Sequence, residues 1–305
     1  MDIVRLKPSY KDYLWGGNKL VTNYGKFFPG KNLAESWELS CHKDGPSKAF
    51  GKDLRDYLYK NPEYSPVDLM GTNIEHYDDF PILIKFIDAR EKLSIQVHPD
   101  DDYAKTHEGG FGKTEMWYIM EAEPGAFLYL GCKKPCSKEE FLKHVEDETL
   151  DEILNKVPVK AGESYLIEAG CLHAIGEGIV ICEVQQNSNL TYRVYDYGRR
   201  DAQGNLRELH LDKAMDVAKL EPPKLEHDFG KFIAKSPSFA VEKIIVYGKI
   251  GLSTKAESFT CLCITKGEGQ VEGLEAHQGQ CFFIPARYGN YSLSGSLDAI
   301  AVTIL

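Results

Sequence analysis

The chain has 305 residues, and 36 Lys+Arg against 46 Asp+Glu give it a formal net charge of −10. This length suits two ordinary domains or one large one, and a composition of 43% hydrophobic and 27% charged residues excludes a disordered or fibrous protein. An acidic chain has no general electrostatic attraction to nucleic acid or to an anionic membrane surface. We therefore expect no nucleic-acid partner and no membrane partner.

The cysteines and the N-terminus indicate the cellular compartment. No apolar stretch approaches the roughly 20 residues that a membrane-spanning helix needs, and the first residues, MDIVRLKPSYKDYLWGG, lack the charged start and apolar run of a signal peptide. Several of the eight cysteines lie inside apolar runs such as VICEV and FTCLCI, where a reduced cysteine serves as a small core residue. We therefore expect a reduced, cytoplasmic protein.

Short runs rich in β-branched and aromatic residues recur along the chain between Gly, Pro and Asp. This rhythm is typical of antiparallel β architecture, either a sandwich or a barrel. A short helix is expected around Asp53–Tyr59. The fold class that we expect is mainly β, with strands over residues 81–89, 92–99, 114–122, 126–131, 178–186, 231–236, 259–267 and 279–286.

Helical periodicity is otherwise confined to the middle of the chain. Ser137 with Glu140 has the spacing of a capping box at the start of a helix, and Thr149 with Glu152 repeats it. Pro158 then ends the helical pattern. Two short helices are therefore expected as a decoration of the β structure.

Two segments share the layout G-x5-P-x-G-x2-H, which resembles the second cupin motif. Gly162–His173 follows this layout except that Glu168 replaces the proline. Gly279–Ala286 repeats its first half, but Arg287 and Asn290 then replace the second glycine and the histidine. The resemblance implies two cupin-type β-barrels (jelly rolls), of which only the first keeps its metal ligands.

The segment Leu220–Lys231, with paired prolines and mixed charges, predicts a domain boundary. We expect a metal-binding cupin domain over residues 1–225, with the small helical insertion near residues 137–156. A degenerate cupin-like β domain without metal ligands is expected over residues 226–305.

Four side chains from three separate stretches have the spacing and chemistry of a metal site. Gln96 and His98 are two apart in a strand-like run, so both can point to the same face. Glu115 opens the next strand, and His173 follows a glycine-containing turn. An amide, two imidazoles and a carboxylate suit a divalent ion, for which Zn²⁺ is the first choice, although such sites accept other first-row metals. We interpret the other seven histidines as core or surface residues.

Long runs of the chain then resemble one family. PILIKFIDAREKLSIQVHPDD, GKTEMWYIM and AGCLHAIGEGIVICEVQQNSNLTYRVYDYGR, together with WGGNKL and ESWELS, resemble type I mannose-6-phosphate isomerases of the shorter bacterial and archaeal branch. The similarity covers most of Tyr13–Arg199, and the C-terminal third matches only as a degenerate cupin. The resemblance implies one Zn²⁺ per chain, held by the same four residues that the spacing selects.

Two departures from the general cupin pattern are features of these isomerases. Gln96 replaces the first histidine of the cupin motif, and 16 residues, Pro99–Thr114, separate His98 from Glu115. Both departures favour this branch over other cupins.

The resemblance places Lys113 in the active site, where it would bind substrate oxygens or phosphate. The run GGFGKT that contains Lys113 is not a P-loop, because His107 stands where a glycine is required and the following segment is typical of a strand. Its glycines indicate either a loop that closes over a substrate or a solvated turn.

Two further charged residues are candidates for catalysis. Arg193 falls on the catalytic arginine of the family, and its guanidinium can hold two oxygens at once; without the resemblance it would be interpreted as a structural ion-pair residue. Glu183 is a carboxylate inside an apolar strand, so it must be paired, metal-bound or functional. It is a candidate general base, and the alternative is a structural partner for Arg193.

Other polar and aromatic residues are candidates for substrate binding. Ser94 shares its parity with Gln96, so it should face the same cavity, and the resemblance implies substrate contact. Trp15 either forms a wall of the sugar site or has a packing role. Arg199 and Arg200 are interpreted as surface charges.

The resemblance implies a metal-dependent aldose–ketose isomerase that interconverts mannose 6-phosphate and fructose 6-phosphate through a cis-enediol(ate). One alternative is a non-haem iron dioxygenase, which also uses two histidines and a carboxylate. Another is a non-catalytic sugar-binding bicupin, which the degenerate C-terminal half would fit. The oligomeric state and the preference for phosphorylated over free sugar stay open.

Overall fold

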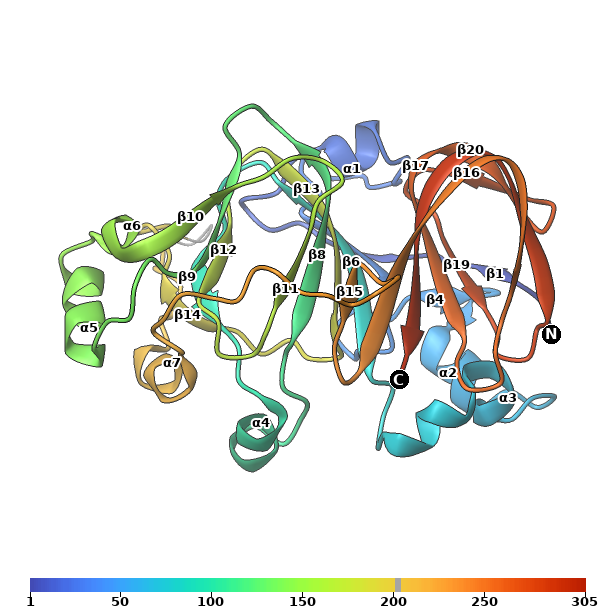
Figure 1. Cartoon of the computed structure of the whole chain (residues 1–305), viewed down its shortest axis with the longest axis horizontal. Coiled ribbons are helices and arrows are strands. Elements are labelled where there is room, and N and C mark those ends of the chain that lie inside the picture. Colours follow the sequence, from blue (N-terminus) through green and yellow to red (C-terminus); the bar gives the residue numbers. More distant parts are fainter. Residues whose placement is uncertain (201–203) are drawn as a thin grey trace.

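The computed structural model describes residues 1–200 and 204–305, and it consists of two β units that lie next to each other (Figure 1). The first unit contains two antiparallel sheets, and the second contains one sheet of long, curved strands. The mainly β fold class is thus confirmed. In the described residues each strand order is an open path, so the first unit is an open two-sheet sandwich, the second is one open curved sheet, and neither is a closed barrel.

The first unit is a sandwich of two sheets. The six-stranded sheet has the order β11 (Ser164–Ile167), β8 (Glu115–Ala122), β13 (Ile179–Gln186), β6 (Ile82–Ala89), β3 (Glu35–Leu39) and β2 (Ser9–Lys11). The five-stranded sheet has the order β10 (Leu154–Pro158), β9 (Phe127–Cys132), β12 (His173–Ile175), β7 (Ile95–Val97) and β14 (Tyr192–Tyr195).

The second unit is built on three long strands that pair side by side. Its strand order is β1 (Val4–Arg5), β19 (Cys281–Ile284), β17 (Thr260–Val271), β20 (Asn290–Ile304), β16 (Phe239–Ser253) and β15 (Ala234–Lys235), with β18 (Leu274–His277) also paired to β17. Because β1 pairs with β19, the start of the chain belongs to the sheet of the second unit. The domain division between residues 225 and 226 stays a prediction.

The central strands β6 and β13 are buried at every position because both faces of their sheet are covered. Along β13, Val180 and Cys182 pack in the core shared with the second unit, whereas Ile179 and Ile181 pack against the five-stranded sheet. A strand covered on both faces carries a nearly continuous apolar run, as this one does. A charged residue at an odd-numbered position of β13 must therefore point between the two sheets of the first unit.

Helices lie at the edges of the β structure (Figure 1). They are α1 (Lys19–Thr22), α2 (Leu54–Tyr59), α3 (Pro66–Met70), the 3-10 helix η1 (Thr72–His76), α4 (Asp101–His107), α5 (Lys138–Glu146), α6 (Leu150–Ile153) and α7 (Leu211–Val217); a small hairpin is formed by β4 (Lys48–Ala49) and β5 (Lys52–Asp53). No helix of the described ranges is long and apolar enough to cross a membrane.

The expected insertion lies between β9 and β10 and contains α5 and α6. Ser137 caps α5 as predicted, because its side chain accepts a hydrogen bond from the backbone N–H of Glu140 at 3.1 Å. The prediction of a second capping box is wrong. Thr149 makes no capping bond; its hydroxyl lies 2.7 Å from His144 Nδ1 instead. The helical pattern also ends before Pro158, which closes edge strand β10, a position that tolerates proline.

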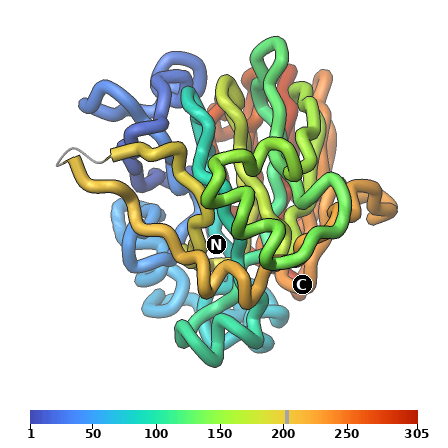
Figure 2. Tube along the Cα trace, turned by 90° about the vertical axis from the view of Figure 1, so that its left-hand side faces the viewer, coloured from blue at the N-terminus to red at the C-terminus, as the bar shows by residue number. Residues whose placement is uncertain are grey.

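The insertion packs against a segment that follows it much later in the chain. Phe141 of α5 and Leu150 share one core cluster with Val194 of β14 and Met215 of α7. Figure 2 looks onto this end of the molecule, where the green insertion lies next to the yellow-to-orange segment that carries α7. The insertion therefore covers the outer face of the five-stranded sheet together with α7.

Candidate metal centre and substrate pocket

The inner face of the six-stranded sheet carries a row of charged side chains. Glu183 of β13 pairs in register with Lys85 of β6 on one side and with Trp117 of β8 on the other. Residues directly opposite one another in a sheet point to the same face, and Glu115 lies two residues before Trp117. The strand period of two thus places three charged groups between the sheets.

The five-stranded sheet presents the other half of the site. Gln96, in the middle of β7, is directly paired with His173 of β12 on one side and with Arg193 of β14 on the other. These three side chains therefore share a face. His98 follows β7 by one residue and keeps the parity of Gln96.

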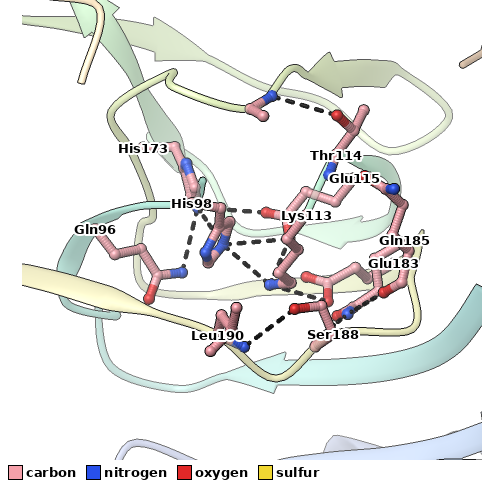
Figure 3. A network of polar contacts seen from close by, with 12 residues as sticks. Gln96, His98, Lys113, Thr114, Glu115, His173, Glu183, Gln185, Ser188 and Leu190 are labelled. Carbon is pink, nitrogen blue, oxygen red and sulfur yellow. Dashed lines mark hydrogen bonds and ion pairs between the residues drawn. The ribbon is translucent and has the colours of Figure 1, made fainter. Parts of the chain in front are cut away.

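The four predicted ligands converge (Figure 3). His98 Nε2 lies 3.1 Å from His173 Nε2, and Glu115 reaches both imidazoles, with its oxygens 3.5 Å and 3.3 Å from those two nitrogens. The amide of Gln96 lies 3.3 Å from His173 Nε2. The ligand atoms of the two histidines and Glu115 all lie within 4.8 Å of one another, close enough to hold one metal ion.

The state of these groups suits a cation. Burial lowers the pKa of His173 to about 4 and that of His98 well below its usual value, so both rings are neutral and offer lone pairs. The Nδ1–H of His173 donates to the carbonyl of Cys171 at 2.8 Å, which leaves Nε2 as the lone-pair nitrogen. Burial, together with Glu183, raises the pKa of Glu115; its Oε2 contacts Lys113 Nζ at 2.6 Å, whereas its Oε1 has no hydrogen-bond donor. A divalent ion would satisfy this carboxylate.

Lys113 lies at the same cluster. Its side chain is more deeply buried than that of a phosphate-binding lysine at the protein surface would be. Its Nζ is 2.6 Å from Glu115 and 3.0 Å from His98 Nε2, and the side chain is buried. The backbone N–H of Lys113 donates to the carbonyl of Pro99 at 2.9 Å, which ties down the end of the glycine-containing loop. Of the two roles predicted for Lys113, this position favours contact with the reacting sugar oxygens.

Glu183 is paired with lysines and not with Arg193. Its Oε2 accepts from the indole N–H of Trp117 at 3.0 Å, while Oε1 lies 3.5 Å from Lys85 Nζ and 4.0 Å from Lys113 Nζ. Burial alone would raise the pKa of Glu183, but the two ammonium groups outweigh it and hold the pKa below the ordinary value. Glu183 is therefore ionised in this pocket.

Sequence reasoning missed Lys85 and Glu35. Lys85 is fully enclosed between Glu183 and Glu35, whose carboxylate is 3.7 Å from its Nζ. The signal was present, because Lys85 is the one charge in the apolar run PILIKFI, just as Glu183 is in ICEVQQ. A buried charge in such a run requires a partner of opposite sign.

Arg193 has its own set of contacts on β14. Its Nη1 donates to the backbone carbonyl of Glu208 at 2.9 Å, and its backbone N–H donates to His210 Nδ1 at 3.2 Å. Burial and the nearby Arg207 lower the pKa of Arg193, which nevertheless stays a cation. Its register with Gln96 places it next to the ligand cluster.

A cavity of about 300 Å³ opens beside the cluster, and it is lined by Arg207 together with eight of the predicted or newly found residues: Trp15, Glu35, Lys85, Ser94, Gln96, Lys113, Glu183 and Arg193. Ser94 and Trp15 both line this cavity, and both side chains are also buried, so their role in binding the sugar stays a prediction.

Arg199 is not a freely solvated surface charge. Its guanidinium pairs with Asp196, its Nη1 donates to the carbonyl of Lys92 at 2.7 Å, and only 17% of the side chain is exposed. Arg200, by contrast, is exposed and donates to the carbonyl of Gly204. The interpretation of both as surface charges was thus correct for Arg200 and wrong for Arg199, because the sequence does not show that Asp196 is buried.

A jelly-roll protein with two histidines and a glutamate converging between its sheets belongs to the class of cupin metalloproteins. Residues 3–125 match the family model described as phosphomannose isomerase type I, catalytic domain. The chain is also 35% identical over 308 residues to a mannose-6-phosphate isomerase of Streptococcus mutans, an alignment that covers 94% of each chain. The chain therefore belongs to the type I mannose-6-phosphate isomerase family, a family of metal-dependent aldose–ketose isomerases, as its sequence motifs predict.

Solved structures support the same family assignment. The mannose 6-phosphate isomerase from Bacillus subtilis superimposes with a TM-score of 0.87 at 30% identity, covering 99% of both chains. A putative mannosephosphate isomerase from Archaeoglobus fulgidus, 22% identical, has the same fold with a TM-score of 0.81. The similarity extends through both β units, including the second one, for which the sequence offered only a degenerate motif.

Proposed function

We propose that this chain interconverts mannose 6-phosphate and fructose 6-phosphate in a metal-dependent reaction. The observation that carries the proposal is the convergence of His98, Glu115 and His173 beside a cavity that also contains Glu183 and Arg193. A metal-dependent aldose–ketose isomerase uses these elements: a site for a Lewis acid, a base, and a fixed positive charge for a developing oxyanion.

The metal that we propose is Zn²⁺, one per chain, with Gln96, His98, Glu115 and His173 as its ligands. Two neutral imidazoles and one carboxylate match the chemistry of a catalytic zinc site and leave a net positive charge on the ion. When bound there, the ion would polarise the carbonyl and hydroxyl oxygens of the open-chain sugar.

Glu183 is our candidate for the base. The reaction moves a proton from C2 of the aldose to C1 through a cis-enediolate, and one base on one face can both remove and return it. Lys85 and Lys113 keep Glu183 ionised and therefore able to accept the proton. Its fixed contact with Trp117 orients the carboxylate, leaving Oε1 toward the pocket.

Arg193 would stabilise the enediolate. Negative charge develops on two adjacent oxygens in the transition state but not in the neutral sugar, so a nearby guanidinium lowers the barrier selectively. Lys113 would contact the same oxygens from the loop that precedes β8. Ser94 and Trp15 are proposed to bind the sugar from the walls of the cavity.

A reducing compartment such as the cytoplasm is the location that we propose. All eight cysteines are free in the structure, and six of them are buried as core residues. A sugar phosphate is likewise an intracellular type of substrate, because its charge prevents passage through a bilayer.

The proposal is tested by incubating the purified protein with mannose 6-phosphate and following fructose 6-phosphate by NMR, with and without a chelator. We expect conversion that the chelator abolishes and added Zn²⁺ restores. Binding of the sugar without conversion would instead support the non-catalytic bicupin, and metal-dependent oxygen uptake would support the dioxygenase.

A further inference from the structure

We propose that Arg207 binds the 6-phosphate of the substrate at the outer end of the pocket and so selects sugars that carry phosphate at the carbon farthest from the carbonyl group. This inference rests on the proposed isomerase function, which requires the carbonyl end of the sugar at the metal cluster. It assigns a phosphate contact to a segment, residues 204–209, to which the family motifs gave no role.

The inner end of the pocket is unsuited to phosphate. Three carboxylates, those of Glu35, Glu115 and Glu183, face the two ammonium groups of Lys85 and Lys113, and all five side chains are buried. One negative charge in excess over the lysines suits a divalent cation. The positions open on that cation are needed by the reacting oxygens of the sugar.

The outer end of the same pocket has the opposite sign. Arg193 and Arg207 both line the cavity, and they are neighbours, because Arg193 Nη1 donates to the carbonyl of Glu208, the residue that follows Arg207. The nearest buried carboxylate, Asp196, already receives the Nε of Arg199 at 3.1 Å and a second contact from its Nη2. Arg207 Nη1 also lies 3.4 Å from both oxygens of Asp196, so one carboxylate is shared by two guanidinium groups and cannot neutralise both.

The carboxylate of Glu208 does not neutralise the positive charge of Arg193 and Arg207. The side chain of Glu208 is 83% exposed and points toward His210, where water screens it. The Arg207 side chain is 31% exposed, so it stands at the mouth of the pocket and can meet a hydrated anion. A guanidinium binds phosphate with two parallel hydrogen bonds, which gives direction as well as charge.

Arg193 links the metal cluster to Arg207. Arg193 is paired in register with the ligand Gln96, and its Nη1 donates to the carbonyl of Glu208, the residue that follows Arg207. An extended hexose with C1 and C2 at the cluster would pass Arg193 and direct C6 toward Arg207. Sugars with phosphate on C1 would instead place the dianion against the carboxylate-rich inner end.

The test compares Arg207→Gln with a matched control, Arg200→Gln, which removes the same charge from an exposed neighbour outside the pocket. For mannose 6-phosphate, Arg207→Gln is expected to raise KM by about 10- to 100-fold with little change in kcat, and the control is expected to behave as wild type. Arg207→Lys, which keeps the charge but loses the bidentate geometry, should fall between them.

A binding measurement separates this inference from the proposed function. Inorganic phosphate should bind the metal-loaded wild type in calorimetry and inhibit competitively, with about 10-fold weaker binding in Arg207→Gln. An unchanged KM for mannose 6-phosphate together with unchanged phosphate binding in that variant would overturn the role of Arg207 while leaving the isomerase intact. A wild type that isomerises no sugar would overturn the proposed function itself.

Discussion

Replacing Glu183 with glutamine is expected to lower kcat for mannose 6-phosphate by about 10²- to 10⁴-fold, the usual contribution of a positioned general base. Glutamine has the same shape and can still accept the hydrogen bond of Trp117, but it cannot take a proton from C2. Lys85 keeps its contact with Glu35, so the buried lysine does not lose its last partner. Steady-state kinetics with the metal-loaded variant measures the effect.

Two readouts make the result specific to proton transfer. Metal content should stay at the wild-type level, because Glu183 is not among the proposed ligands. Exchange of the C2 proton of mannose 6-phosphate with solvent, followed by NMR in D₂O, should slow together with kcat. A Glu183→Gln variant that turns over and exchanges at the wild-type rate would remove Glu183 from the mechanism and leave it a partner of the two lysines.

Replacing Arg193 with alanine is expected to lower kcat by about 10²- to 10³-fold, the range found when one donor to a developing oxyanion is removed. The loss should fall on kcat more than on metal content, because Arg193 donates to the backbone of Glu208 and not to a metal ligand. The measurement is kcat and KM for mannose 6-phosphate, with the bound metal quantified in the same samples.

Arg193→Lys is the matched control for charge without the guanidinium geometry. We expect it to recover part of the lost kcat, since lysine supplies the charge but not two parallel donors. If Arg193→Ala turned over normally, the assigned role in stabilising the enediolate would be wrong, and the arginine would be a structural element of β14.

Much of the site could be predicted from the sequence alone, because alternate residues of a strand point to the same face. Gln96 and His98 are two residues apart, and the alternation of buried residues in β8 places Glu115 on the same inner face as Trp117. The convergence of these residues with His173 required only that the predicted strands belong to two facing sheets. The family motifs added Arg193, whose chemistry no local pattern reveals.

Features that depend on distant pairing could not be predicted. The strand β1 joins the sheet of the second unit although some 275 residues separate it from β19. The ion pairs of Lys85 with Glu35 and Glu183 join three strands whose order the sequence does not state. The capping prediction at Thr149 failed for a related reason, because a nearby histidine competes for its hydroxyl.

Helix α4 was also missed, for a local reason. Its seven residues are polar almost throughout, and only Ala104 is buried, so no apolar stripe indicates a helix. Its N-cap was nevertheless visible, since Asp100 accepts a hydrogen bond from the backbone N–H of Tyr103. A helix that short is stabilised by its cap and its surroundings more than by a periodic pattern.

A crystal structure of the zinc-loaded protein, with diffraction recorded on both sides of the zinc absorption edge, tests the central claim most directly. The account predicts one anomalous peak per chain, about 2.0–2.2 Å from His98 Nε2, His173 Nε2 and a Glu115 oxygen, with Gln96 completing the set. An active enzyme whose only metal lay elsewhere, or that held no metal while it converted mannose 6-phosphate, would contradict it.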